Sequence, residues 1–274
     1  MLNIPEYKEY AGETKIALMD NSSLAFMHEL SQRSYPSDGI LSVYDLILIP
    51  KWVMEEIEDS TYRSTYVEQL QAQGYPIRWI DETKYGAFVN DEDVNLYYIV
   101  EAAVSRVSEL MRFLRRKVKT EDLIDLPSAE EWMNRLYDEW PIHGRTLSTG
   151  RTLKKNAGEI SLTILAEIFA WYHDGVDSLT IYTQDTDAHE FQTNAERILI
   201  GNSEFTPALD PKRKNPLRAL CRERYEQQRS RQKISCTGRG SQRVWCRPLS
   251  KMSLCMMEDA SWFGSNMSRA YRIL

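Results

Sequence analysis

Short apolar runs alternate with segments of helical periodicity over the first 210 residues of the 274-residue chain. Four runs have strand length and are rich in aliphatic or β-branched residues: residues 15–19, 45–50, 76–80 and 178–183. Three neighbouring segments have apolar residues at helical spacing: residues 22–32, 51–59 and 157–175. Because strands and helices alternate, the pattern predicts an α/β protein with three layers, α/β/α, in which helices cover both faces of a mainly parallel sheet.

The interval between the third run and the 157–175 helix is also helical in pattern. Residues 92–119 carry a broad apolar stripe, so we expect one long helix there. A second helix is expected over residues 127–140, with Ser128 as its N-cap and Glu131 completing a capping box. The chain therefore has more helix than alternation with four strands requires.

The charge is unevenly distributed along the chain. The net charge is −6, but residues 1–211 hold 19 Lys and Arg against 36 Asp and Glu, whereas residues 212–274 hold 15 against 4. That last segment lacks apolar periodicity, and we expect a poorly packed or disordered basic tail. Two origins stay open for it, an arm that binds nucleic acid and an altered reading frame. All four cysteines lie in it without the close pairs of a zinc site, so free thiols are expected.

Nothing in the sequence predicts a membrane protein. No apolar run has the roughly 18 residues of a membrane helix, and the first residues lack the order of a signal peptide. We therefore expect a cytoplasmic protein without a membrane partner.

Acidic residues stand where the predicted strands end. Asp20 directly follows the first run, and the Asp185-x-Asp187 pair follows the fourth. Glu56 and Glu159 lie in the first turns of helices that adjoin strands. Sites in open α/β sheets form outside the carboxyl ends of the strands, so these acids are expected at one edge of the sheet. Each acid alone also has a structural explanation, as a helix cap, a charge that favours a helix N-terminus or a solvated surface residue.

Four stretches resemble the motifs of the PIN domain family of metal-dependent nucleases. "IALMDNSSLAF" resembles the first motif, a strand that ends in Asp, and "LILIPKWVMEEI" resembles the second, a strand and a turn before a helix that carries Glu. "NAGEISLTILA" is similar to the third, an acid that opens a helix, and "IYTQDTDAHEF" to the fourth, a strand that ends in Asp-x-Asp. The four stretches follow the family order over about residues 15–205.

The resemblance implies a nuclease domain over residues 1–211 that binds Mg²⁺ or Mn²⁺. The implied ligands, which are also the implied catalytic residues, are Asp20, Glu56, Glu159, Asp185 and Asp187. Hard oxygen ligands suit these ions, which promote phosphodiester hydrolysis. The 103 positions from Glu56 to Glu159 exceed the spacing in small family members, so residues 91–145 are interpreted as a helical insertion. The family analogy favours RNA as the substrate, with a second copy of the chain or an inhibitory protein as further partners.

Weaker candidates adjoin the motifs. Those expected near substrate are Asn21, Ser22, Lys154 and Lys155. Asn21 and Ser22 are expected to orient Asp20, although Ser22 has an N-cap role as its alternative. The two lysines are expected either as phosphate contacts or as solvated charges. Glu55 competes with Glu56, but the apolar residues around it and the family pattern favour Glu56. His189 is expected on a helix surface.

Three other functions compete with an RNA nuclease. A nuclease that acts on DNA would use the same acids. A phosphatase of the haloacid dehalogenase type also has Asp-x-Asp after a strand, but on its first strand, whereas here the pair follows a late one. A non-catalytic module would use the acids to bind a basic partner or leave them solvated.

Overall fold

The computed structural model describes most of the chain and divides it into two units. The described residues are 3–32, 38–119, 123–147, 150–185, 187–210, 217–220, 244–249 and 252–257. Residues 1–221 form the first unit, which contains every predicted site residue, and residues 222–274 form the second.

A parallel sheet of five strands lies at the centre of the first unit. Its strands are β1 (Lys15–Met19), β2 (Leu46–Pro50), β3 (Ile77–Ile80), β6 (Ser178–Tyr182) and β7 (Leu217–Leu220). The order is β3-β2-β1-β6-β7, and every neighbouring pair is parallel. The first four strands confirm the four predicted runs. The central strand β1 is apolar on both faces because both are buried, as expected of a parallel sheet.

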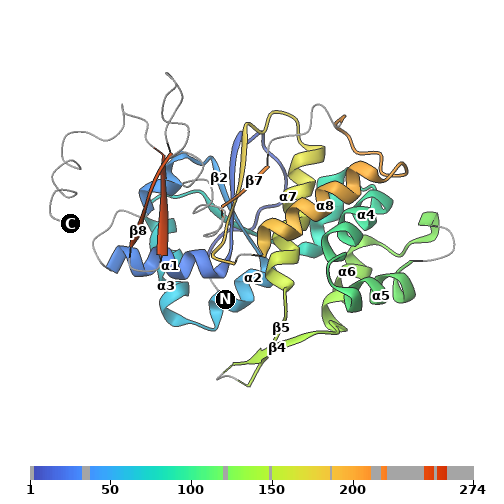
Figure 1. Ribbon diagram of the computed structural model, residues 1–274, viewed down its shortest axis with the longest axis horizontal. Helices are drawn as coiled ribbons and strands as arrows, with labels where there is room; N and C mark the ends of the chain where they lie inside the picture. The colour runs from blue at the N-terminus through green and yellow to red at the C-terminus, as the bar shows by residue number, and fades with distance from the viewer. Residues whose placement is uncertain are drawn as a thin grey trace. The chain divides into compact units, whose positions relative to one another are not determined.

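Helices cover the two faces of the sheet, which confirms the predicted three-layer α/β/α fold. On one side lie α1 (Asn21–Gln32), α2 (Lys51–Glu58) and α3 (Thr61–Ala72), which pack on one another. On the other side α7 (Ala157–Tyr172) packs on β1, β2 and β6, and α4 (Asp93–Val104) and α8 (Ala188–Gly201) pack against it (Figure 1). Since α7 is the middle helix of that layer, almost every one of its residues is buried.

The prediction of one long helix over residues 92–119 is wrong, because this segment forms two helices, α4 and α5 (Ser108–Lys117). At the break, the Ser105 hydroxyl donates to the Ala102 carbonyl at 2.6 Å and accepts from the amide of Asn194, on α8, at 2.6 Å. Val107 is extended, with φ −116° and ψ 96°. A side chain of another helix thus contacts the end of α4, a contact that apolar spacing within the segment does not indicate.

Short elements complete the first unit: η1 (Asp38–Val43), η2 (Glu82–Val89), η3 (Leu123–Asp125), α6 (Ala129–Asp138), β4 (His143–Thr146) and β5 (Thr152–Lys154). The predicted cap of α6 is present, since Ser128 Oγ accepts from the Glu131 N–H at 3.4 Å. None of the helices in the described ranges has the length and apolar character of a membrane span.

The strand β7 lies within the stretch that the sequence analysis assigned to the tail. Its pairing with β6 places the end of the sheet beyond residue 211, so the domain boundary shifts towards residue 221. A four-residue strand without clear alternation is hard to recognise in a basic segment, which explains the difference. In the second unit, β8 (Val244–Leu249) and β9 (Met252–Met257) form an antiparallel pair. The remaining residues of the predicted tail lie outside the described residues.

Candidate acidic site at the carboxyl edge of the sheet

Asp20 lies at the point where β1 ends and α1 begins. Its N–H donates to the Tyr182 carbonyl at 3.0 Å, which continues the β1–β6 pairing, and its carbonyl accepts from Leu24 N–H at 3.2 Å as the first bond of α1. The residue is only 6% exposed. Backbone bonds on both sides therefore fix the position of a buried carboxylate at the edge of the sheet.

Two hydroxyl groups bind the Asp20 carboxylate to the loop after β6. Ser22 Oγ donates to Asp20 Oδ2 and accepts from the Gln184 N–H at 3.0 Å. Thr183 Oγ1 donates to the same carboxylate oxygen at 3.0 Å and accepts from the Asp185 N–H at 3.0 Å. The structure thus places Ser22 where it orients Asp20. Thr183 was missed by the sequence analysis, and its place at the end of a strand beside two aspartates was the available signal.

Glu56 and Glu159 approach Asp20 from two helices. Glu56 lies on α2, where its Oε2 accepts from Asn21 Nδ2 at 3.2 Å. Glu159 is in the first turn of α7. The preceding Gly158 permits this approach: a Cβ there would lie 3.3 Å from Val53 Cγ2 and 4.0 Å from Asp20 Oδ1. A glycine therefore lets the start of α7 lie against α2 and the acid.

Asp20, Glu56, Glu159 and Asp185 form one electrostatic group, which we call the acidic cluster. Burial raises the pKa of Asp20, and the charge of Asp185 adds to the rise. Burial and the charge of Asp20 raise the pKa of Glu56 to about 7. Burial, the charge of Asp20 and the contact with Asp185 raise the pKa of Glu159 to about 8. Burial, with repulsion between the carboxylates as the second cause, therefore keeps protons on Glu56 and Glu159 near neutral pH.

A buried oxygen without a partner adjoins the acidic cluster. Asn21 is 9% exposed, and while its amide nitrogen donates to Glu56, its Oδ1 has no hydrogen-bond partner. Within the described ranges, however, no three His, Cys, Asp or Glu side chains are arranged so that they could hold a metal ion. As it stands, the cluster is thus a set of interacting acids and one unsatisfied oxygen.

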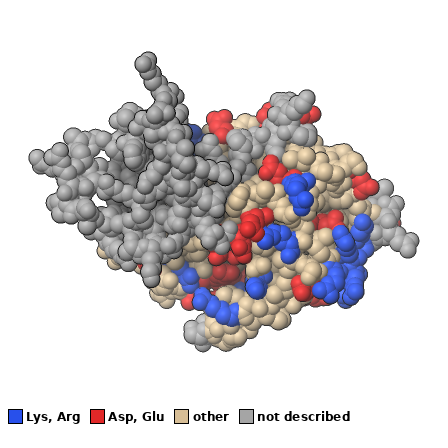
Figure 2. All heavy atoms as spheres, in the orientation of Figure 1, with Lys and Arg blue, Asp and Glu red and all other residues tan. Residues whose placement is uncertain are grey.

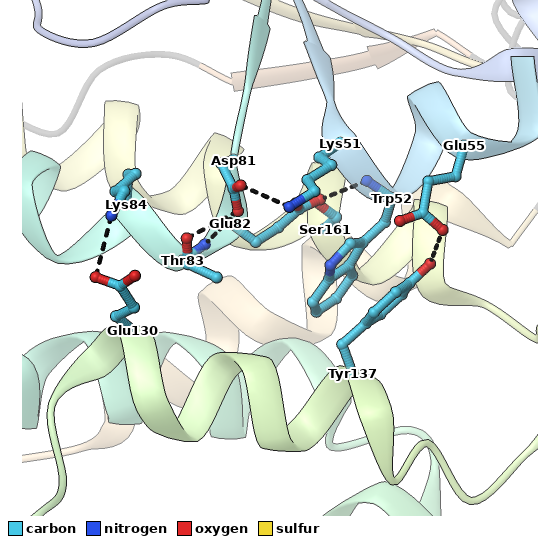
Figure 3. A network of polar contacts seen from close by, with 10 residues as sticks. All are labelled: Lys51, Trp52, Glu55, Asp81, Glu82, Thr83, Lys84, Glu130, Tyr137 and Ser161. Carbon is cyan, nitrogen blue, oxygen red and sulfur yellow. Dashed lines mark hydrogen bonds and ion pairs between the residues drawn. The ribbon is translucent and has the colours of Figure 1, made fainter. Parts of the chain in front are cut away.

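The structure separates Glu56 from Glu55. Glu55 Oε2 accepts a hydrogen bond from the Tyr137 hydroxyl and an ion-pair contact from Arg151, so this carboxylate points towards α6 and the β4–β5 hairpin (Figure 3). Glu56 instead faces Asn21. The sequence preference for Glu56 thus agrees with the orientation of α2.

The other predicted residues lie around the cluster. Asp187 is exposed at the N-cap position of α8 and makes no side-chain capping bond. Lys154 is half-buried, with its ammonium 3.3 Å from the centroid of the Tyr137 ring and donating to the Tyr137 carbonyl. Lys155 is exposed. His189 lies on α8 with Nδ1 3.2 Å from Thr193 Oγ1, one turn further on.

A second buried acid, Glu82, joins the two helices that carry Glu56 and Glu159. Its Oε1 accepts from the Trp52 N–H at 3.0 Å, at the start of α2, and from Ser161 Oγ at 2.7 Å, in the first turns of α7 (Figure 3). The side chain is fully buried, and burial raises its pKa to about 8. Glu82 therefore sets the relative position of the two helix starts, a role that the sequence analysis did not assign.

Comparison with known proteins adds no identification. The chain matches no protein-family model, no curated protein and no solved structure. The functional interpretation therefore depends on the sequence motifs and on the geometry of the acidic cluster.

Proposed function

We propose that the protein is a metal-dependent nuclease that cleaves RNA with the acidic cluster. The observation that carries the proposal is the convergence of four acids from four separate segments at the carboxyl edge of a parallel sheet, next to the unpartnered Asn21 Oδ1. Sites of α/β proteins form at this edge. The resemblance of the four motifs to the PIN domain family supports the same reaction class, and the choice of RNA rests on that analogy.

The donor types suit Mg²⁺ or Mn²⁺, although no three of the described His, Cys, Asp or Glu side chains are arranged around one ion in this structure. All the candidate ligands are oxygens, which these ions prefer, and the acids lie in a site whose excess negative charge a cation would offset. The residues that would hold the ion are Asp20, Glu56, Glu159 and Asp185, with Asn21 Oδ1 as a neutral donor and Asp187 at the margin. When bound, such an ion supplies Lewis acidity towards a phosphodiester.

The chain's own groups have separate tasks in this proposal. Ser22 and Thr183 hold Asp20 in one orientation, so that it needs little reorganisation when a cation or a substrate arrives. Glu56 and Glu159, with pKa values of about 7 and about 8, retain protons near neutral pH that a cation must displace. Cation affinity is therefore expected to increase with pH over this range.

Cleavage of a labelled single-stranded RNA by the full chain tests the proposal. We expect cleavage in Mn²⁺ or Mg²⁺ and none in EDTA, and we expect Asp20→Asn and Glu159→Gln each to lower the rate about 100-fold or more, because an ionic ligand is lost. The matched control is Glu68→Gln, which removes an exposed acid of α3. Circular dichroism checks that each variant is folded.

Different substrates separate the competing functions. Full cleavage in EDTA, or wild-type cleavage by both variants, would reject the metal-dependent mechanism. RNA binding without cleavage would favour a non-catalytic module. Equal rates on single-stranded DNA would make the enzyme a general nuclease, and hydrolysis of p-nitrophenyl phosphate without RNA cleavage would favour a phosphatase.

A further inference from the structure

The hairpin of β4 and β5 is a cationic segment in an otherwise acidic domain. Residues 143–155, "HGRTLSTGRTLKK", contain four Lys and Arg, one His and no Asp or Glu, whereas residues 1–211 carry a net charge of −17. All four residues of β4 are exposed. Figure 1 shows the hairpin projecting from its unit, and Figure 2 shows Lys and Arg in that region next to a patch of Asp and Glu. Four like charges therefore gather on one projecting element.

The base of the hairpin is fixed to the body of the domain. Trp140 Nε1 donates to the Lys155 carbonyl at 3.1 Å, and Lys155 N–H donates to the Ile142 carbonyl at 3.1 Å. Lys154 lies over the Tyr137 ring, which stacks on Trp52 of α2 with centroids 4.8 Å apart. The hairpin also leads directly into α7, where Glu159 lies in the first turn. Its charges are thus held at a defined place relative to the acidic cluster.

One face of the hairpin is directed towards α2. The Thr146 and Thr152 hydroxyls contact each other at 3.1 Å, and the pairing of β4 with β5 is irregular between His143 and Thr146, next to Arg145. Arg151 contacts the carboxylate and the carbonyl of Glu55. Burial and Asp20 raise the pKa of the next residue, Glu56, and the charge of Arg145 offsets a small part of that rise. The arginines therefore border the acidic cluster.

Two cations of the hairpin are available for a ligand. Arg145 and Lys155 are exposed, and neither side chain makes a hydrogen bond or a close ion pair with any residue that the structure describes. Arg151 and Lys154, in contrast, are engaged by Glu55 and Tyr137. The hairpin thus pairs two anchoring cations with two that face solvent.

We propose that the hairpin of residues 143–155 is a phosphate-binding arm that holds the backbone of a single-stranded RNA beside the acidic cluster, with Arg145 and Lys155 as its phosphate contacts. The choice of RNA rests on the proposed function. An acidic cluster repels a polyanion, and cations at its border offset that repulsion while they release counterions from the nucleic acid. The hairpin sequence has no aromatic residue on which a base could stack, so the arm binds the backbone and tolerates any base sequence.

Salt-dependent binding tests the arm without requiring catalysis. The full chain is titrated in EDTA against a fluorescein-labelled single-stranded RNA of about 12 nucleotides, and the slope of log K against log salt concentration is measured from about 50 to 200 mM. We expect Arg145→Gln combined with Lys155→Gln to lower the magnitude of the slope by about 1.4, since each lost phosphate contact on a single strand removes about 0.7. Two RNAs of unrelated sequence should lose affinity by the same factor.

A control variant removes an exposed cation elsewhere, one charge against the two of the hairpin variant. The Arg116 side chain, on α5, is exposed and has no hydrogen bond or ion pair to a described residue, and α5 is itself a basic helix. Arg116→Gln should leave the slope unchanged. The proposal of a phosphate-binding arm would be overturned if the hairpin variant and wild type had equal salt slopes, or if Arg116→Gln lowered the slope as much as the hairpin variant does. Melting curves establish that the variants are folded. The single variant Arg145→Lys should keep the salt slope of wild type, because a lysine also contacts phosphate.

The outcome for the arm is separate from that for the nuclease. If the hairpin variant binds RNA with a lower salt slope but wild type does not cleave RNA in Mn²⁺, the proposed phosphate-binding arm is supported and the proposed nuclease function is rejected. If wild type cleaves and the hairpin variant keeps its slope, the nuclease stands and the arm fails.

Discussion

Two acidic environments adjoin helix α2 and differ in what surrounds the carboxylates. Glu82 is fully buried and accepts hydrogen bonds from the Trp52 N–H and the Ser161 hydroxyl. One turn along the helix, Glu56 receives a bond from Asn21 and faces Asp20, another acid. Both glutamates have a raised pKa because of burial. The difference lies in the partners: two protein donors bind Oε1 of Glu82 while its Oε2 has no partner, whereas the acidic cluster brings together several carboxylates whose negative charges repel one another.

This comparison separates a structural acid from a ligand-binding one. A carboxylate between two helix starts and bound to their donors holds those helices together, and its removal should cost stability. Carboxylates that repel one another destabilise the free protein, and a cation that binds them gains affinity from that repulsion. The three predictions below test this distinction, in order of decreasing expected effect.

Glu82→Ala should destabilise the protein by about 2–4 kcal/mol. The substitution leaves the Trp52 N–H and the Ser161 hydroxyl buried without their acceptor and creates a cavity between α2 and α7. Denaturant unfolding in EDTA measures the free energy of unfolding. The control is Glu68→Ala, at an exposed helical position, which should change this free energy by close to zero. A loss below about 1 kcal/mol would show that Glu82 does not join the two helices.

Glu82→Gln should flatten the dependence of stability on pH. Burial raises the pKa of folded Glu82 to about 8, while in the unfolded chain it is near 4.3. The folded state therefore binds more protons between these values, and its stability is full below about pH 4 and lost as the pH rises through about 8. Glutamine carries no such proton, so the slope between pH 6 and 8 should decrease by up to about 1.4 kcal/mol per pH unit.

The acidic cluster provides the control for that measurement. Glu56 and Glu159 also have raised pKa values, so the Glu82→Gln variant should retain part of the slope, and adding Glu159→Gln should reduce it again. A slope identical to that of wild type in Glu82→Gln would mean that Glu82 is ionised in the folded protein at neutral pH.

Glu159→Gln should have the smallest effect on the free protein. Because it removes a charge that Asp20 and Asp185 repel, the metal-free variant should be as stable as wild type at pH 8 or more stable by no more than about 1 kcal/mol. The rise in melting temperature that Mn²⁺ produces in wild type should shrink in the variant, since a ligand stabilises in proportion to its affinity. A clear loss of metal-free stability would place Glu159 in the same class as Glu82.

The elements that follow regular patterns could be predicted from the sequence. The strands at residues 15–19 and 178–182 follow from short apolar runs, and α2 and α7 from their periodicity. In the hairpin, β4 is exposed throughout and β5 has only three residues, so no alternation of apolar and polar positions reveals it. At the break after α4, Ser105 accepts a hydrogen bond from Asn194, almost ninety residues away, and no local signal contains that contact.

By itself, the sequence determined which acids stand at strand ends and helix starts, because local periodicity sets where elements begin and end. It predicted Asp20, Glu56, Glu159 and Asp185 in this way. Only the tertiary structure decided how they meet. The burial of Trp52 and Val53 sets the rotation of α2, which directs Glu56 towards Asn21 and Glu55 towards Tyr137. The apolar spacing within α2 already indicates its buried face, but the groups that lie opposite Glu55 and Glu56 belong to segments far apart in the chain, and packing against β2, β3 and α7 brings them there.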